Sequence, residues 1–193
     1  VLGRGRSFRT ASADALVRVG RPSFQLTSRV RSGGLSRPLG LRFGKEGFEG
    51  RFAGRPVSGL AELATVLPAQ AIDPEVHRLI EGGPQERRRF LDWGVFHVEP
   101  SFVEHWRRYQ RALRQRNAAL RTGLAAAVVR AWDPELLEAG ELVAGFRSRY
   151  VESLRPQVAA VAERLLGEPL EIALHQGWAN ERSLRDALEA AWP

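Results

Sequence analysis

The residues of this chain whose type and spacing could do chemistry are its arginines, and the chemistry is the binding of phosphate. The sequence of 193 residues contains 29 lysines and arginines, and Lys45 is the single lysine among them. A planar guanidinium group can donate two hydrogen bonds to one phosphate at once. A GC-rich genome would also replace lysine with arginine, but it would not produce the formal net charge of +7. This surplus favours an anionic partner.

Four arginines are spaced so that a helix would place them on one face: Arg107, Arg111, Arg114 and Arg121. The apolar residues of this segment also follow three- and four-residue spacing, which predicts a helix that begins near Ser101. They are Phe102, Trp106, Tyr109, Leu113, Leu120 and Leu124. Helical geometry puts the two faces about 130° apart. The basic face is therefore either a solvated surface or a surface that contacts DNA phosphates.

A second basic group is the triplet Arg87, Arg88 and Arg89 in the segment PQERRRFLD. A proline and a glutamate ahead of the triplet favour the start of a helix there. Successive helical residues point about 100° apart, so at most two of the three arginines can reach one phosphate backbone. We expect another to pair with Glu86 or Asp92 within the protein, and all three are candidates for DNA binding.

The elements that must position these arginines are helices, and a sheet precedes them. Apolar residues alternate with period two in the first third of the chain, which predicts an antiparallel meander with one buried face. They are Phe24, Leu26, Val30, Leu39, Leu41, Phe43, Phe48 and Phe52. Lys45 lies in the sequence GKEG, which lacks the second upstream glycine and the Ser or Thr of a phosphate-binding loop. We interpret GKEG as a hairpin turn.

A short buried strand is predicted at 66–72, and Asp73 and Pro74 would start a short helix after it. The apolar pattern of 134–165, with Asp133 as its cap, predicts a long helix that pairs with 101–121 as an antiparallel hairpin. The fold class predicted up to this point is α+β, a sheet followed by a helical lobe.

The end of the chain carries three weaker patterns. Pro156 should kink the long helix, because it lacks an amide hydrogen and clashes with the preceding turn. Alternating apolar residues at 170–174 predict a short strand, and 180–190 predicts a last helix.

Composition excludes several kinds of site. The absence of cysteine excludes disulfides and thiolate metal sites and is natural in a reducing compartment. No apolar run is long enough to span a bilayer, so we expect a cytoplasmic protein. The four histidines lack metal-ligand spacing, and no nucleophile elbow or paired-carboxylate signature occurs, so we expect no metal site and no catalytic residue. Because the sequence contains no methionine, we also expect it to be a piece of a longer chain.

Three motifs carry a resemblance to a known family: SFRT at 7–10, GGPQERRRFLDWG at 82–94 and RQRNAAL at 114–120. The chain resembles the middle of RecF, a bacterial DNA replication and repair protein with an ABC-type ATPase head. The resemblance implies a partial ATPase-head lobe with antiparallel strands at 1–72. It also implies a helical arm lobe at 73–167 and a strand and helix that return to the head at 168–193.

The resemblance implies a function as well. RecF-like proteins bind DNA at gaps and single-strand/double-strand junctions in an ATP-dependent manner, and the full-length protein would use ATP and Mg²⁺ and form an ATP-dependent homodimer. It would be nucleoid-associated and support recombinational repair, the SOS response and RecA loading with RecO and RecR. Gln70 matches the place where an ABC-type head has a glutamine that reaches the magnesium ion and the attacking water.

The phosphate loop, the signature serine motif and the acidic magnesium motif of such a head would lie outside 1–193. We therefore expect this chain alone to be inactive as an ATPase. Two other hypotheses remain open. The lobe could be a non-catalytic scaffold that docks proteins or supports a dimer, with its arginines serving solubility and internal ion pairs, or it could belong to another Rad50-like ATPase.

Overall fold

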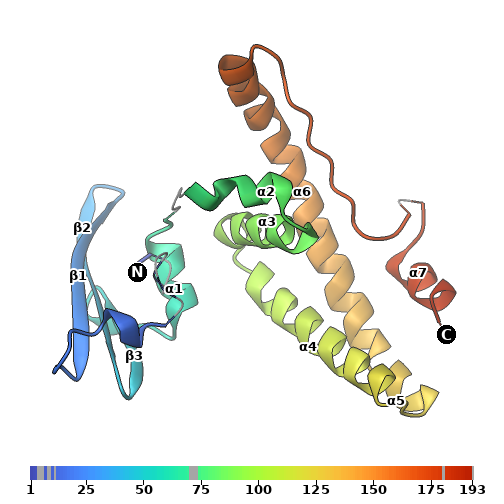
Figure 1. Ribbon diagram of the computed structural model, residues 1–193, viewed down its shortest axis with the longest axis horizontal. Helices are drawn as coiled ribbons and strands as arrows, with labels where there is room; N and C mark the ends of the chain where they lie inside the picture. Colours follow the sequence, from blue (N-terminus) through green and yellow to red (C-terminus); the bar gives the residue numbers. More distant parts are fainter. Residues whose placement is uncertain (4–6, 8–9, 11, 70–73, 180, 193) are drawn as a thin grey trace. The chain divides into compact units, whose positions relative to one another are not determined.

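The computed structural model describes residues 1–3, 7, 10, 12–69, 74–179 and 181–192. These residues form two compact units, Val1–Val76 and His77–Pro193. The first unit contains the sheet and the second contains the long helices (Figure 1).

The first unit is an antiparallel meander, as the alternating apolar pattern predicts. A 3-10 helix, Asp14–Leu16, precedes the strands. The sheet has the order β1-β2-β3-β4, and its strands are β1 (Ser23–Ser32), β2 (Leu35–Gly44), β3 (Gly47–Phe52) and β4 (Arg55–Pro56).

Tight two-residue turns join the first three strands. Gly33 and Gly34 connect β1 to β2 with φ angles of 56° and 78°, the left-handed values of a type I′ hairpin turn, which glycine adopts without strain. Lys45 and Glu46 connect β2 to β3 between the paired residues Gly44 and Gly47. The interpretation of GKEG as a hairpin turn is therefore confirmed.

One face of the sheet packs against helix α1 (Leu60–Val66), where Leu39, Leu41 and Leu63 are fully buried. The strand predicted at 66–72 is wrong for the described residues 66–69, since Val66 ends α1 and no strand follows it. Helix α1 occupies the segment up to Val66, and its start is stabilised locally: the carboxylate of Glu62 accepts hydrogen bonds from the backbone N–H and the hydroxyl of Ser58, at 2.7 and 2.9 Å. Such a contact ties down the first turn of a helix.

The second unit is helical throughout its regular elements. A 3-10 helix, Pro74–His77, leads into it. Its helices are α2 (Arg78–Glu81), α3 (Pro84–Val98), α4 (Phe102–Arg121), α5 (Ala126–Arg130), α6 (Asp133–Leu166) and α7 (Leu184–Ala190). Val95, Phe102, Val143 and Phe146 form its core, contributed by α3, α4 and α6.

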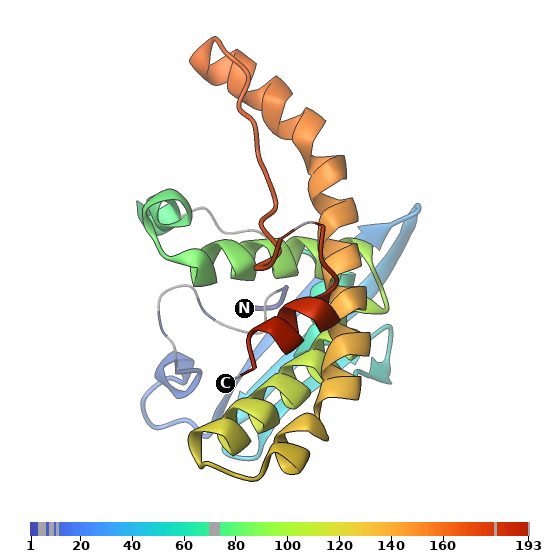
Figure 2. The same cartoon turned by 90° about the vertical axis from the view of Figure 1, so that its right-hand side faces the viewer.

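The antiparallel hairpin of α4 and α6 is confirmed (Figures 1 and 2). Its predicted cap is one residue out, because Trp132 is the cap of α6 and Asp133 is its first helical residue. The helix continues through Pro156 without a break, and its C-terminal part leans away from the direction of its first part (Figure 2).

The segment after α6 corrects two predictions. Residues 168–179, after the left-handed C-cap Gly167, form no strand in the part of the chain that the structure describes; they run back beside α6 instead (Figures 1 and 2). Ile172, Leu174, Gln176 and Trp178 are half-buried while Ala173, His175 and Gly177 between them are exposed, so one side of this segment packing on helices produced the period-two pattern. The last helix begins at Leu184, not at 180, because Ser183 and Asp186 form a capping box.

Candidate nucleic-acid interface

The four arginines predicted to form a basic face on α4 are all exposed: Arg107, Arg111, Arg114 and Arg121. The buried residues of α4 are Phe102, Ala112, Arg116 and Ala119. By helical geometry the buried set and the four arginines lie about 170° apart. Small alanines at the buried positions allow α6 to pack closely on that side. The four arginines therefore lie on the side of α4 away from its buried residues, and we call them the α4 basic face.

The charge of this face is hardly compensated within its own helix. Between residues 102 and 121 there are six arginines and one acid, Glu104. Among the described residues, Arg107, Arg114 and Arg121 make no ion pair and no hydrogen bond through their side chains, while Arg111 lies close enough to Glu135 to help lower the pKa of that carboxyl. Free guanidinium groups on one helix face are available to phosphates.

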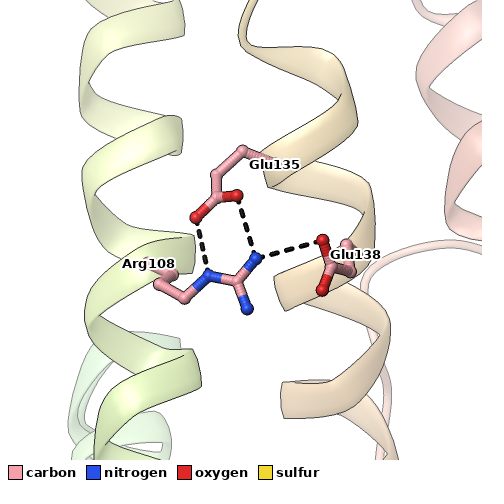
Figure 3. Close-up of polar contacts among 3 residues, drawn as sticks. All are labelled: Arg108, Glu135 and Glu138. Carbon is pink, nitrogen blue, oxygen red and sulfur yellow. Dashed lines mark hydrogen bonds and ion pairs between the residues drawn. The ribbon is translucent and has the colours of Figure 1, made fainter.

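Two other arginines of α4 serve a different purpose, which sequence reasoning missed. Arg108 donates from Nε and an Nη to the two carboxylate oxygens of Glu135, at 2.7 and 3.0 Å, and from Nη to Glu138 at 3.0 Å (Figure 3). These hydrogen bonds raise the pKa of Arg108 and lower the pKa of Glu135. Arg116, which is buried, donates to Asp133 at 2.8 Å. Both arginines hold α4 to α6. The acidic residues at the start of α6 were the feature of the sequence that could have indicated these ion pairs.

The three arginines of the triplet on α3 differ in their partners, as their angular spacing predicts. Arg87 donates to the backbone carbonyls of Leu79, Ile80 and Gly82, at 3.3, 3.1 and 2.8 Å, so it satisfies acceptors at the end of α2. Arg89 pairs with Glu86 at 3.0 Å, which confirms the expected internal pair.

Arg88 is the member of the triplet that is exposed and makes no side-chain hydrogen bond or ion pair with the described residues. It lines a groove of about 530 Å³ between α3, α6 and residues 172–178, as does Arg87. Of the three triplet candidates for DNA binding, Arg88 keeps its whole donor fork free, and Arg87 and Arg89 are already engaged.

Asp92 binds residues that the sequence did not suggest. Its carboxylate accepts two hydrogen bonds from Arg147, at 2.7 and 2.9 Å, and a third from the indole N–H of Trp106 at 2.9 Å. These partners lie on α6 and α4, so Asp92 of α3 ties three helices together. The contact fixes the hairpin that carries the α4 basic face.

Two predicted positions bear on nucleotide binding. Gln70 lies outside the described residues. Lys45 is exposed in the turn between β2 and β3, where the backbone closes a hairpin and does not encircle a phosphate. Lys45 therefore does not form part of a phosphate-binding loop.

No helix in the described part of the chain has the length and apolar character needed to cross a membrane. The two units together define an α+β chain that joins an antiparallel sheet to a lobe built on a basic helical hairpin, and the predicted fold class is confirmed.

Comparison with known proteins gives one consistent result. No family model matches the chain. The chain is 38% identical to RecF of Thioalkalivibrio sulfidiphilus over 191 residues, 41% to RecF of Pseudomonas fluorescens over 200 residues, and 40% to RecF of Xanthomonas axonopodis pv. citri over 197 residues. These relatives are described as DNA replication and repair proteins, and the matches cover 97–99% of this chain. Over almost its whole length the chain is therefore homologous to RecF.

The chain spans about half the length of the curated relatives it matches, 53% in each of these three cases. Its fold is that of solved structures of the recombination mediator protein RecF in the RecFOR pathway, one with ATP and one described as RecF-ATPrS. Both match with a TM-score of 0.81 and 22% identity over 98% of this chain and 52–53% of theirs.

Proposed function

We propose that this chain supplies a DNA-binding surface of a RecF-type repair protein. The observation that carries the proposal is the α4 basic face: four exposed arginines on one side of a helix whose other side is fixed to α6. Arginines spaced along a helix can follow the charge of a phosphate backbone, but they present no geometry that distinguishes one base pair from another. Binding should therefore be strong at low salt and independent of sequence.

The wider setting of this surface follows from the homology to RecF. In the whole protein we infer ATP-dependent binding to gapped DNA or to single-strand/double-strand junctions, with ATP and Mg²⁺ held by parts outside 1–193. The same inference includes an ATP-dependent homodimer, RecR and RecO as partners, a part in RecA loading and the SOS response, and a place at the nucleoid in the cytoplasm. Gln70 would face the magnesium ion in that assembly.

The direct test is binding of this chain to fluorescently labelled duplexes of unrelated sequence, measured by anisotropy across a range of salt concentrations. We expect all the duplexes to bind with similar affinity and with a logarithmic affinity that falls linearly as the logarithm of the salt concentration rises. A strong preference for one duplex, or an affinity that salt does not change, would contradict the proposal.

A scaffold function is the second candidate, and the internal arginine pairs favour it. Arg108, Arg116 and Arg147 hold helices together and cannot serve a phosphate without breaking those contacts. If the chain binds no DNA at any salt concentration yet folds, the scaffold hypothesis is preferred.

A further inference from the structure

The uncovered face of the β-sheet carries arginines that the proposed function does not use. Directly paired residues of antiparallel strands lie on the same face. The register therefore places Arg29, Arg31, Arg42 and Arg51 on the face opposite Leu39 and Leu41, which pack on α1. All four side chains are exposed. We call this surface the outer sheet face.

Positive charge on the outer sheet face is only weakly compensated. Glu49 is the one acid among the residues of that face in β1, β2 and β3, and it pairs with Arg42 at 3.8 Å with both side chains more than half exposed. Such a pair neutralises little charge. The sequence shows the same bias, since residues 15–45 contain seven cations and no acid.

The register also spreads the arginines along the strands. Arg42 lies in the row of Gln25 and Glu49, Arg51 in the row of Thr27 and Gly40, and Arg29 and Arg31 in the two rows beyond. Rows on one face are two residues apart, roughly 6.6 Å at 3.3 Å per residue. Each of four successive rows thus holds one arginine, which suits an extended chain of negative charges.

Gly40 is a second and independent observation. It lies inside β2, where glycine weakens a strand, and its φ is not in the left-handed region. A Cβ built at this position would meet no heavy atom within 4 Å, so packing within the protein does not require glycine. An interior glycine without a structural reason often marks a place where a ligand approaches the backbone closely.

The remaining residues of the face decide between kinds of partner. Besides Gly40 and Glu49 they are Ser23, Gln25, Thr27, Ser36, Pro38, Gly44, Gly47 and Pro56, without an aromatic or large aliphatic side chain. A protein partner would need such an anchor, because buried aromatic and apolar groups dominate protein–protein binding energy. A nucleic acid needs only donors to its phosphates.

We propose that the outer sheet face binds the phosphate backbone of a nucleic acid, with Gly40 leaving room for the closest phosphate. This rests on the proposed function for the class of ligand, but it assigns a second surface, in the other unit of the chain.

The test compares two triple variants of the full 193-residue chain by anisotropy with a labelled duplex. Arg29→Gln, Arg31→Gln and Arg51→Gln remove charge from the outer sheet face. Arg18→Gln, Arg21→Gln and Arg55→Gln remove the same charge from exposed positions of the same unit that do not belong to that face. At about 0.1 M salt each lost phosphate contact costs up to about eightfold in affinity. We therefore expect the first variant to bind at least about tenfold more weakly and the second to stay within about twofold.

Gly40→Val tests the inference without changing the net charge of the chain. A β-branched residue suits a strand and has open space here, so the melting temperature should hold or rise, while DNA affinity falls several-fold.

Each other outcome counts against the inference. If the parent chain binds no DNA, the proposed function and this inference both fail. If the parent binds and only substitutions on the α4 basic face weaken it, this inference alone is wrong. Equal losses in the two triple variants, with Gly40→Val unchanged, would show that only net charge matters. A face that binds an acidic peptide but no duplex would also overturn it.

Discussion

At the scale of one residue, Asp92 holds helices of the second unit together. It contacts Arg147 and Trp106, and the side chains of Arg147 and Asp92 are only 16% and 19% exposed. Removing one partner of a buried pair leaves the other charge without compensation, which costs about 3–5 kcal/mol when burial is complete. Because burial is incomplete, we expect Asp92→Ala to lower the free energy of unfolding by about 2–3 kcal/mol in urea denaturation.

The matched control for Asp92 is Glu99→Gln. Glu99 lies 3.9 Å from Arg149, whose side chain is 63% exposed. An exposed pair of this kind contributes about 0–1 kcal/mol, so the control should change stability by less than about 1 kcal/mol. Equal effects of the two substitutions would show that Asp92 does not organise the hairpin.

Single residues also show what the sequence could not reveal. Spacing was enough to find that Arg107, Arg111 and Arg114 share an exposed face. It could not show that Arg108, beside Arg107, turns inward to Glu135 and Glu138, since that contact depends on residues 27 and 30 positions away. Pairing across helices requires the tertiary structure, and spacing within one helix does not.

At the scale of elements, the contact of α3 with α6 depends on Gly94. A Cβ at Gly94 would overlap the ring and hydroxyl of Tyr150. In an open helix, replacing glycine with alanine gains up to about 1 kcal/mol. Here overpacking should dominate, and we expect Gly94→Ala to destabilise the protein by about 1–3 kcal/mol in thermal or urea unfolding.

Gly145 on α6 is the control for Gly94. The nearest atom to a Cβ there is an Nη of Arg149 at 3.5 Å, an ordinary contact. Gly145→Ala should therefore stabilise the protein by up to about 1 kcal/mol. If both alanines stabilise, α3 and α6 do not pack as closely as described.

We expect the stability of the protein to depend on pH through His97, which lies on α3. Its Nε2 is buried without a hydrogen-bond partner in the described residues, and burial lowers its pKa below the usual 6.5. The unfolded chain then binds more protons than the folded chain as pH falls below about 6.5, so stability decreases in that direction. We expect the melting temperature to drop between pH 7.5 and 5.5, and His97→Leu to reduce the drop. His175→Gln, at an exposed position, should leave it unchanged.

The elements that the sequence predicted well are those whose apolar residues repeat so that they all face one packing partner. The meander and the α4–α6 hairpin are of this kind, with Leu39 and Leu41 on one face of β2 and Val143 and Phe146 on one face of α6. The failure at 170–174 has a physical reason: an extended chain has period two whether a sheet or a helix covers one side of it.

At the scale of the whole molecule, the absence of a phosphate-binding loop from the sequence leads to a prediction about nucleotide. Calorimetry of the 193-residue chain with ATP and Mg²⁺ should detect no binding in the micromolar range, because Lys45 lacks the neighbours that cradle phosphate. Micromolar binding would contradict the proposal that this chain corresponds to a part of RecF outside the phosphate loop.

The sequence indicated a sheet followed by a helical lobe, but it could not show which arginines are free to bind an anionic partner. The sequence favoured an anionic partner through a surplus of arginine, but the surplus includes structural arginines such as Arg108, Arg116 and Arg147. Once these are set aside, the α4 basic face remains as a surface of the second unit whose arginines are exposed.

The most direct test of this account is the salt dependence of duplex binding by the parent chain and by the variant Arg107→Gln, Arg111→Gln and Arg114→Gln. Each phosphate contact contributes about 0.9 to the slope of logarithmic affinity against logarithmic salt concentration. Arg155→Gln, Arg164→Gln and Arg182→Gln, all at exposed positions, remove the same charge as a control. We predict that the α4 variant flattens the slope by up to about 3 units equally for unrelated duplexes, while the control keeps the parent slope. A folded α4 variant with the parent affinity and slope would contradict the account.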